Sequence, residues 1–304
     1  MTEARSADST VTFDDSGRPA LPNQLTVVIP AYNEGDHVAP GLDEIRAVMD
    51  QTDWEYEIIV VDDGSVDNTA EAAAATGVRV IRHRKNRGYG ASLKTGIANA
   101  KYGWILITDA DGTYPAEFIP QLLERAPSND MVVGARVGKK VHIPLIRRPP
   151  KWFLRRLASF LSGQEIPDLN SGLRLMRKDL INRYKHLLPS GFSFTTTITL
   201  SAACNEHDLE YVTIDYHARL GQSKIRPYHA YEFTLLILRT IVVFNPLKVF
   251  IPLGAVLMAI GLAKFGYDVT QNNLSESSIF AMLTAMLFWA VGLLADQNAR
   301  MNNR

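Results

Sequence analysis

The stretch GWILITDADGTYP, residues 103–115, leads an apolar run directly into two carboxylates that are one residue apart. Its first part, Trp104 to Ile107, is apolar at every position, which is typical of a strand covered on both faces of a parallel sheet. Open parallel sheets bind their ligands beyond the carboxyl ends of such strands. The stretch therefore predicts a buried parallel strand whose carboxyl end carries a site at Asp109 and Asp111.

Short β-branched runs separated by helical stretches continue on both sides of this strand. Further strands are expected at LTVVIP, YEIIVVDD, VRVIRH and DMVVGAR, with helices such as 38–49 and 69–75 between them. Strands that alternate with helices build a parallel sheet through crossover connections. The chain from residue 25 to about residue 215 therefore predicts an α/β fold with a Rossmann-like, mostly parallel, doubly wound sheet.

The composition fits such a domain joined to a membrane anchor. The chain has 304 residues, a formal net charge of zero and a single cysteine, Cys204, which excludes an internal disulfide and fits a reducing compartment. Two apolar segments, 247–267 and 278–295, each approach the roughly 20 residues needed to cross a bilayer. A buried helical pair is the alternative, since the second segment is short and Lys248 and Lys264 bracket the first.

The charges around the two apolar segments predict their orientation. The linker DVTQNNLSES carries no Lys or Arg, whereas basic residues precede the first segment and follow the second. The positive-inside rule then predicts a hairpin with both chain ends in the cytoplasm. We therefore expect a multi-pass protein of the cytoplasmic membrane whose site faces the cytoplasm.

A basic segment lies within the predicted α/β domain. From residue 131 to residue 164 there are Lys and Arg residues but no acid, including the run IRRPPKWFLRR. Such a run is ordinarily a solvated face and is also compatible with nucleic acid, but Trp152 and Phe153 favour a membrane interface. The segment therefore predicts contact with the bilayer, and nucleic acid is not expected as a partner.

The chain is thus expected to consist of a sheet domain and a membrane hairpin joined by interface helices. The first 24 residues are polar and acidic, without the apolar core of a signal peptide, and predict a disordered tail. The expected boundaries are 1–24 for the tail, 25–227 for the α/β domain with an interface helix at 147–163, 228–246 for a second interface helix, 247–267 and 278–295 for the membrane helices, and 296–304 for a cytoplasmic tail.

Polar residues follow three of the expected strands and should meet along one edge of the sheet: Tyr32, Asn33, Glu34, Asp62, Asp63, Asp109 and Asp111. Each loop by itself resembles an ordinary turn or helix cap, and for Asp67 and Asn68 we retain that interpretation. Together, three polar strand ends would form a crevice of the size that a nucleotide needs. Because Mg²⁺ binds carboxylate oxygens together with substrate phosphates, a divalent cation bound at Asp109 and Asp111 would neutralise a diphosphate.

At this point the sequence resembles a known family. The motifs VVIPAYNE, VVDDGSVDNT, NRGYGASLKTGI, DADGTYP, DLNSGLRLMR and RLGQSKIRP are similar to those of family 2 glycosyltransferases of GT-A fold. More narrowly, they resemble the dolichol-phosphate mannosyltransferases and the bacterial polyprenyl-phosphate glycosyltransferases. The resemblance implies an inverting, Mg²⁺- or Mn²⁺-dependent transfer of one hexose from a nucleoside diphosphate sugar, with UDP or GDP as the nucleotide, to polyprenyl phosphate.

The resemblance also implies roles for individual residues. The nucleotide sugar would be held by Pro30, Ala31, Tyr32, Asn33, Glu34, Asp62, Asp63, Lys94, Asp109, Ala110, Asp111 and Arg136. The lipid phosphate would be held by Arg155, Ser159, Arg219 and Lys224, the metal by Asp109 and Asp111, and catalysis would depend on Asp109, Asp111, Asp168 and Arg219. The mannosyltransferases commonly have a Gln where this sequence has Thr113, so a third protein ligand of the metal is not assigned.

The expected acceptor is inferred from a missing acid. A hydroxyl acceptor needs a general base, and relatives that use one present an acidic residue in the segment that here reads GFSFTTTITL. A phosphate monoester, with its second pKa near ~6, is largely ionised at pH 7 and needs no base. The absence of the QxxRW motif of processive synthases favours a single transfer.

Other readings stay open at the level of sequence. The acceptor could instead be a different lipid or a saccharide, or the chain could be a catalytically silent, nucleotide-binding membrane scaffold. A soluble nucleotidyltransferase would need a Gly-rich triphosphate loop after the first strand, which PAYNEG does not supply. Assembly into a homo-oligomer is also left open.

Overall fold

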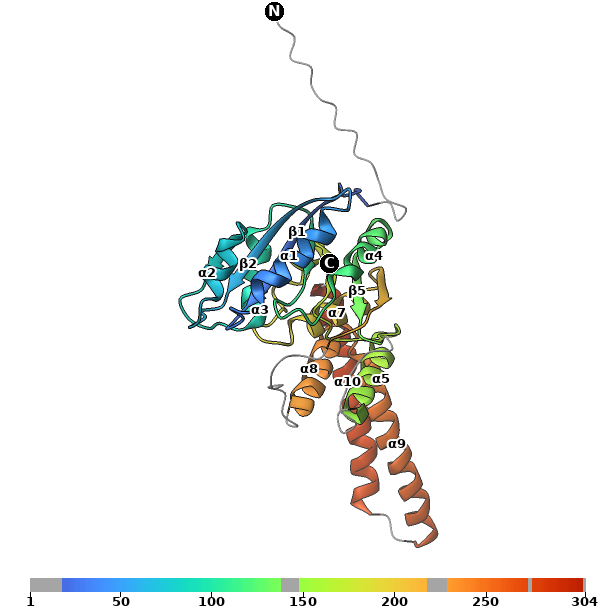
Figure 1. Cartoon of the computed structure of the whole chain (residues 1–304). Helices are drawn as coiled ribbons and strands as arrows, with labels where there is room; N and C mark the ends of the chain where they lie inside the picture. Colours follow the sequence, from blue (N-terminus) through green and yellow to red (C-terminus); the bar gives the residue numbers. More distant parts are fainter. Residues whose placement is uncertain (1–17, 138–147, 218–228, 273–274, 303–304) are drawn as a thin grey trace, which may run out of the picture. The chain divides into compact units, whose positions relative to one another are not determined.

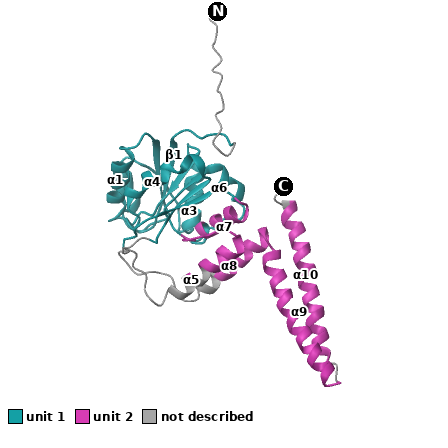
Figure 2. Cartoon of the chain, turned by 90° about the vertical axis from the view of Figure 1, so that its right-hand side faces the viewer, with its two compact units in different colours: residues 1–142, 171–194, 207–222 teal, residues 143–170, 195–206, 223–304 magenta. Residues whose placement is uncertain are grey.

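A computed structural model describes residues 18–137, 148–217, 229–272 and 275–302 of the chain (Figure 1). These residues belong to two compact units that interleave along the sequence (Figure 2). The first unit comprises residues 1–142, 171–194 and 207–222, and the second comprises residues 143–170, 195–206 and 223–304. The predicted tail up to residue 17 and the predicted phosphate-binding residues Arg219 and Lys224 lie outside the described residues.

The first unit contains a seven-stranded sheet in the order β3-β2-β1-β4-β6-β5-β7. Its strands are β1 (Gln24–Ala31), β2 (Glu55–Asp62), β3 (Arg79–Arg82), β4 (Trp104–Ile107), β5 (Met131–Ala135), β6 (Arg174–Arg177) and β7 (Leu209–Thr213). Strands β3, β2, β1 and β4 are parallel to one another, and β5 is parallel to β7. The predicted α/β fold with a mostly parallel sheet is therefore confirmed.

Strand β6 is the exception, because it runs antiparallel to both β4 and β5. The chain enters β6 at the carboxyl edge of its neighbours: Ser171 Oγ donates to the Gly134 carbonyl at 2.5 Å, and Gly172 N–H donates to the Tyr114 hydroxyl at 2.6 Å. From that edge the strand can only run back through the sheet. Since β6 is antiparallel to both neighbours, β4 and β5 still point in the same direction.

Helices cover the sheet on both faces. They are α1 (Val38–Met49), α2 (Thr69–Ala75), α3 (Tyr89–Asn99), α4 (Ile119–Glu124) and α6 (Lys178–Tyr184), with 3₁₀ turns η1 (Ala116–Phe118) and η2 (Ala126–Ser128). Val27 and Ile29 of β1 are at most 2% exposed and share a core with Leu42 of α1. Val28 points to the other face, where Gly96 of α3 lies against it. Burial on both faces explains why β4 is apolar at every position and β1 is apolar from Val27 to Ala31.

The first described residues already belong to this unit. Arg18 forms an ion pair with Asp130 at the start of β5, and the Pro19 carbonyl accepts a hydrogen bond from Arg177 Nη2 at 3.0 Å. The predicted disordered tail was expected to reach residue 24. Residues 18–24 instead continue into β1 and are held to the first unit by polar contacts that a single sequence does not reveal.

The second unit consists of helices. They are α5 (Arg148–Ser162), α7 (Phe194–Cys204), of which Phe194 belongs to the first unit, α8 (His229–Phe244), α9 (Leu247–Thr270) and α10 (Glu276–Asn302). Helices α5 and α8 lie where interface helices are expected. Helices α9 and α10 extend past the predicted membrane segments because hydrogen-bonded helix continues into flanking polar residues.

Helices α9 and α10 pack through glycines that admit large side chains of the facing helix. A Cβ at Gly254 would lie 2.3 Å from Trp289 Nε1, and one at Gly292 would lie 2.7 Å from Phe250 Cβ. The Trp289 indole N–H donates to the Ile251 carbonyl at 3.2 Å. Small residues that let helices approach closely are typical of helix pairs in membranes.

The two helices are long and apolar enough to cross a membrane, and this favours a membrane hairpin over a buried pair. They contain 24 and 27 residues, more than the roughly 20 that a bilayer requires. In their most apolar windows only 11% and 17% of the residues are buried inside the protein. A buried pair would hide most of its apolar side chains, whereas these helices leave them available for lipid.

The close contact between α3 and the sheet predicts a steric requirement at Gly96. A Cβ there would lie 2.3 Å from Val28 Cγ1, so Gly96→Ala should lower the free energy of unfolding by about 1–3 kcal/mol through overpacking. Gly41 of α1 is the matched control, since its nearest contact would be 3.5 Å away. Gly41→Ala should be neutral or stabilise by up to about 1 kcal/mol. Thermal unfolding of the full chain in detergent measures both, and equal effects would contradict the packing argument.

Candidate active site

The loops that follow β1, β2 and β4 leave the sheet at the same edge. Ala31, the last residue of β1, is paired with Asp62, the last residue of β2, and Val28 is paired with Ile107 at the end of β4. Because these strands are parallel, the structure brings together the three polar strand ends expected from the sequence. Arg136 follows β5, whose carboxyl end lies at this edge as well.

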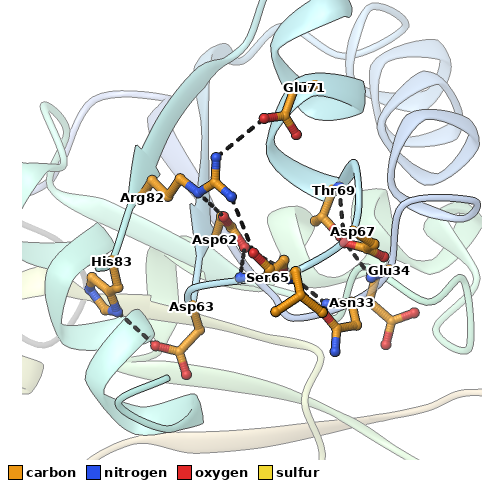
Figure 3. Close-up of polar contacts among 11 residues, drawn as sticks. Asn33, Glu34, Asp62, Asp63, Ser65, Asp67, Thr69, Glu71, Arg82 and His83 are labelled. Carbon is orange, nitrogen blue, oxygen red and sulfur yellow. Dashed lines mark hydrogen bonds and ion pairs between the residues drawn. The ribbon is translucent and has the colours of Figure 1, made fainter. Parts of the chain in front are cut away.

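The loops after β1 and β2, residues 32–37 and 63–68, are interlocked and are called the loop pair here (Figure 3). Asn33 N–H donates to Ser65 Oγ at 2.9 Å, and Asn33 Oδ1 accepts from Val66 N–H at 3.0 Å. Glu34 N–H donates to Thr69 Oγ1 at 2.9 Å. Asn33 has a φ of 56°, a left-handed conformation that asparagine tolerates better than most residues. The loop pair is therefore one hydrogen-bonded surface.

Asp67 stabilises this surface as a turn residue, as expected. Its Oδ1 accepts hydrogen bonds from the N–H, at 3.1 Å, and the hydroxyl of Thr69, and its Oδ2 accepts from Gly35 N–H at 3.1 Å. Desolvation acts to raise the pKa of Asp67, but these hydrogen bonds outweigh it and lower the pKa. Asn68 is the N-cap residue of α2, yet its side chain makes no capping hydrogen bond.

Asp62 is fully buried and holds the loop after β2 in place (Figure 3). Its Oδ1 accepts hydrogen bonds from the N–H of Ser65, at 3.0 Å, and from the Ser65 hydroxyl. Its Oδ2 forms an ion pair with Arg82 Nε at 3.1 Å, and Arg82 also reaches Glu71 at 3.2 Å. These contacts give Asp62 a clear role in shaping the loop pair.

Asp63, the next residue, fixes the start of α3. Its Oδ1 accepts from Arg87 N–H at 2.9 Å and its Oδ2 from Gly88 N–H at 2.8 Å. The same carboxylate lies 2.7 Å from His83 Nδ1, and His83 Nε2 lies 2.9 Å from the Thr95 hydroxyl. With its proton on Nδ1, His83 donates to Asp63 and accepts from Thr95. His83 thus supports the loop before α3.

Tyr89, the first residue of α3, contacts Asp109, the first carboxylate of the sequence Asp109-Ala110-Asp111, which is called the DxD motif here. Its hydroxyl donates to Asp109 Oδ1 at 3.1 Å, and its ring stacks on Phe192, with centroids 5.8 Å apart and 18° between the planes. Burial raises the pKa of Tyr89 well above its ordinary value, and the charge of Asp109 adds to the effect, so the phenol remains a donor. Sequence reasoning missed both aromatic residues. The only signal was a tyrosine between two glycines.

The second carboxylate is oriented by its own loop. Asp111 Oδ1 accepts from the N–H of Thr113 at 3.2 Å and from its hydroxyl at 2.6 Å. Asp109 and Asp111 are both half-buried. Thr113 thus donates to a predicted metal ligand in this structure.

The segment after β7 runs beside the DxD loop. His217 N–H donates to the Thr113 carbonyl at 3.0 Å, and the rings of Tyr216 and Tyr114 meet edge to face at 5.1 Å. The guanidinium carbon of Arg136 lies 5.2 Å from the Tyr216 ring centre and 6.0 Å from that of Tyr114. The two aromatic faces hold the Arg136 cation at the carboxyl end of β5.

Comparison with known proteins identifies the family. The profile described as "Glycosyl transferase family 2" matches residues 26–185, more than half of the chain, and the profile "GtrB C-terminal hairpin" matches residues 245–301. The chain belongs to glycosyl transferase family 2. The predicted family is therefore confirmed, and the second match supports α9 and α10 as a membrane hairpin.

Two relatives of this glycosyltransferase cover most of its length. It is 31% identical over 219 residues to the dolichyl-phosphate hexose transferase of Haloferax volcanii. This match covers 71% of this chain and 89% of the relative. It is 30% identical over 308 residues to the undecaprenyl-phosphate 4-deoxy-4-formamido-L-arabinose transferase of Pseudomonas fluorescens. This match covers 91% of this chain and 85% of the relative.

A solved structure confirms the GT-A fold. Glucosyl-3-phosphoglycerate synthase from Mycobacterium tuberculosis, in complex with Mn²⁺, UDP and phosphoglyceric acid, matches with a TM-score of 0.57 and 19% identity. The match covers 74% of this glycosyltransferase and 84% of that chain. At this identity the likeness concerns the fold alone.

The DxD residues of this glycosyltransferase fit a hard divalent cation. Their donors are carboxylate oxygens, and a Cβ at Gly172 would lie 3.0 and 3.1 Å from the two carboxylate oxygens of Asp109, so only glycine leaves that space open. Among the described residues there is no cluster of three or more His, Cys, Asp or Glu side chains that could hold a metal. Diphosphate oxygens and water would complete the shell, as is usual for Mg²⁺.

The remaining donor-site predictions fall on several elements of the first unit. Pro30 and Tyr32 are half-buried, and Ala31 and Ala110 are buried, at the ends of β1 and β4. Lys94 lies within α3, and its ammonium donates to the Leu188 carbonyl. Burial and the charge of nearby Lys185 lower the pKa of Lys94. This contact gives Lys94 a role in holding the segment after α6.

Among the described residues, three of the predicted site residues belong to the second unit. Asp168 is 1% exposed, and its Oδ1 accepts from Asn170 N–H at 3.3 Å. Ser159 Oγ of α5 accepts from Ile166 N–H at 3.0 Å, and Arg155 of the same helix is half-buried. Helix α5 and the segment before Asp168 are therefore linked within one unit.

The contacts of Asp63 predict that it matters for stability. Asp63→Ala would leave two backbone N–H groups and buried His83 without their acceptor, and should lower the free energy of unfolding by about 3–5 kcal/mol. The matched control is Asp67→Ala, which removes an exposed turn carboxylate and should cost about 1 kcal/mol. Chemical denaturation of the full chain in detergent measures both. A loss for Asp63→Ala no larger than that of the control would show that the network is dispensable.

Proposed function

We propose that this glycosyltransferase transfers one hexose from a UDP- or GDP-sugar to polyprenyl phosphate at the cytoplasmic leaflet, with inversion and with bound Mg²⁺ or Mn²⁺. The observation that carries the proposal is the Asp109–Asp111 pair at the carboxyl end of β4, beside the loop pair. The names of the two relatives, a dolichyl-phosphate and an undecaprenyl-phosphate transferase, support a polyprenyl phosphate as the acceptor.

The donor would bind across the edge of the sheet. The loop pair, held rigid by the contacts of Asn33 and Asp62, is suited to the base and ribose, since its backbone is already ordered. Asp109 and Asp111 would hold the metal ion, which when bound supplies positive charge to the departing diphosphate. Arg136, fixed between two tyrosine rings, adds a cation at the same edge.

The acceptor would not need to be deprotonated by the enzyme. Thr195, Thr196 and Thr197 of α7 are at most 3% exposed, and a threonine hydroxyl is not a general base. A phosphate monoester is already largely ionised at neutral pH. One of its oxygens would attack the anomeric carbon as the bond to the nucleoside diphosphate breaks, so that the electron pair of that bond leaves with the diphosphate and no proton has to move.

The lipid phosphate requires cations near the bilayer. We assign this role to Arg155 of α5, with Arg219 and Lys224 from the segment after β7. The Ser159 hydroxyl would donate a hydrogen bond to the phosphate, and Asp168 would act near the reacting sugar. Trp152 and Phe160 of α5 are 59% and 69% exposed, as expected of a helix that lies in a membrane interface. A helix of this kind would present its basic residues at the depth of a lipid headgroup.

A transfer assay tests the donor, the acceptor and the role of α5. Membranes containing the full chain, incubated with labelled UDP- and GDP-sugars and polyprenyl phosphate, should form a labelled lipid. Arg155→Ala should reduce this rate at least 10-fold with unchanged donor affinity, because a charge-assisted bond to the acceptor is lost. Arg156→Ala, the exposed neighbour, should be nearly neutral. Efficient transfer to dephosphorylated polyprenol would exclude the base-free mechanism, and labelling of another acceptor alone would favour a different family 2 activity.

The proposed orientation predicts which side of the membrane the hairpin turn occupies. Cysteine in place of exposed Gln271 should react with an impermeant maleimide in intact cells, whereas cysteine in place of Met301 should react only after permeabilisation. The native Cys204 should contribute little, because burial raises the pKa of its thiol to about 11. The reverse labelling pattern would rule out a cytoplasmic active site.

A further inference from the structure

The hydroxyl of Tyr89 is directed at one oxygen of the DxD motif, and the family assignment leaves this contact unexplained. Tyr89 begins α3, whereas Asp109 follows β4, and the 3.1 Å hydrogen bond joins residues 20 apart in the chain. The neutral tyrosine hydroxyl does not replace the charged carboxylate as a metal ligand. As a hydrogen-bond donor, it can set the direction in which that carboxylate points. Its contribution would be to orientation.

Tyr89 is itself held by the backbone on both sides. Arg87 N–H and Gly88 N–H donate to the buried Asp63 carboxylate just before it. Ala91 N–H donates to the Ser190 carbonyl at 3.0 Å just after it. These bonds define the position of the first turn of α3, so the tyrosine ring leaves the helix from a fixed point.

Two glycines make this position available. Gly88 has a φ of 99°, and a Cβ there would lie 2.6 Å from the Ser190 carbonyl oxygen. A Cβ at Gly90 would lie 2.4 Å from the Pro189 carbonyl oxygen. Only glycine lets α3 begin this close to residues 189–191, and the same approach brings the Tyr89 ring against the next residue, Phe192.

Phe192 then limits the rotation of the tyrosine ring. The rings are nearly parallel, at 18°, and Phe192 remains 69% exposed. Because most of the Phe192 side chain is exposed to solvent, its burial contributes little to stability. The stacked contact with Tyr89 is therefore its main interaction in this structure. Gly172 also lies against Asp109, since a Cβ there would be 3.0 and 3.1 Å from the two carboxylate oxygens.

We propose that Tyr89 is a positioning residue that holds the Asp109 carboxylate in the orientation that the metal ion needs, with Phe192 fixing the tyrosine ring. The inference rests on the proposed metal-dependent function. A carboxylate has about four lone-pair directions, and a donor on Oδ1 selects which of them face the site. Hydrogen-bond partners of metal ligands typically change metal affinity by about 10- to 100-fold when they are removed.

Direct Mn²⁺ binding to the full chain in detergent tests the inference without turnover. Free Mn²⁺ is measured by electron paramagnetic resonance in the presence of UDP and, separately, of GDP. Tyr89→Phe keeps the stacked ring and removes only the hydroxyl, and should raise the Kd for Mn²⁺ about 10- to 100-fold. Phe192→Leu, which keeps the hydroxyl, should raise it less. In the transfer assay, the turnover lost in Tyr89→Phe should return as the Mn²⁺ concentration is raised.

Tyr56→Phe is the matched control. The Tyr56 hydroxyl donates to Asp50 at 2.5 Å, so this variant also loses a tyrosine–aspartate hydrogen bond, but one that involves no predicted site residue. Its Mn²⁺ affinity should equal that of the wild type, and both variants should keep the wild-type thermal unfolding profile. Asp111→Asn should abolish measurable binding.

Each remaining outcome decides one of the two proposals. If the wild type binds Mn²⁺ and Tyr89→Phe binds it equally well, the positioning role is wrong and the proposed function stands. An equal loss of affinity in Tyr56→Phe would also overturn it, because the effect would not be local. If the wild type binds no Mn²⁺ with either nucleotide, the metal-dependent function fails, and the inference fails with it.

Discussion

The geometry of this glycosyltransferase depends on one buried carboxylate, that of Asp63 at the end of β2. It accepts two backbone N–H groups from the loop before α3 and contacts His83 at 2.7 Å. This fixes the first turn of α3, and therefore the tyrosine that reaches Asp109. A carboxylate buried without such partners would be costly, so the fold retains the loop that satisfies it. The loop before α3 is ordered at this edge of the sheet because its N–H groups compensate the buried Asp63 carboxylate.

A related constraint orders the hairpin, where water is not available to satisfy polar groups. Glycines let α9 and α10 approach, and the indole of Trp289 donates to a backbone carbonyl of the other helix. At the turn, Asp268 is 5% exposed and accepts from Ser275 while it pairs with Lys264 at 3.1 Å. The lysine that seemed to interrupt the first apolar segment therefore has its charge compensated at the end of the helix.

Several elements were predictable and others were not, for identifiable reasons. The strand ending at Ile107 and the hairpin could be recognised because burial on both faces leaves an uninterrupted apolar run, and a membrane span leaves an apolar segment of about 20 residues. Strand β6, RLMR, is too short for such a signal, and its antiparallel direction depends on where residues 171–173 meet the neighbouring strands. Likewise, residues 18–24 have a tail-like composition, and their order comes from contacts with distant residues such as Asp130 and Arg177.

The candidate site divides in the same way. The sequence by itself determined the family, the parallel strands, the carboxylates at their ends and the apolar hairpin, because motif order, strand periodicity and segment length are local properties. Only the tertiary structure decided that Asp62 and Asp63 brace the loops, that Thr113 orients Asp111, and that Tyr89 reaches Asp109. Except for the bonds of Asp62 to Ser65 and of Asp111 to Thr113, which join neighbours in the chain, these contacts depend on how loops fold back or on which strands are neighbours, and strand order is set by packing of the whole sheet.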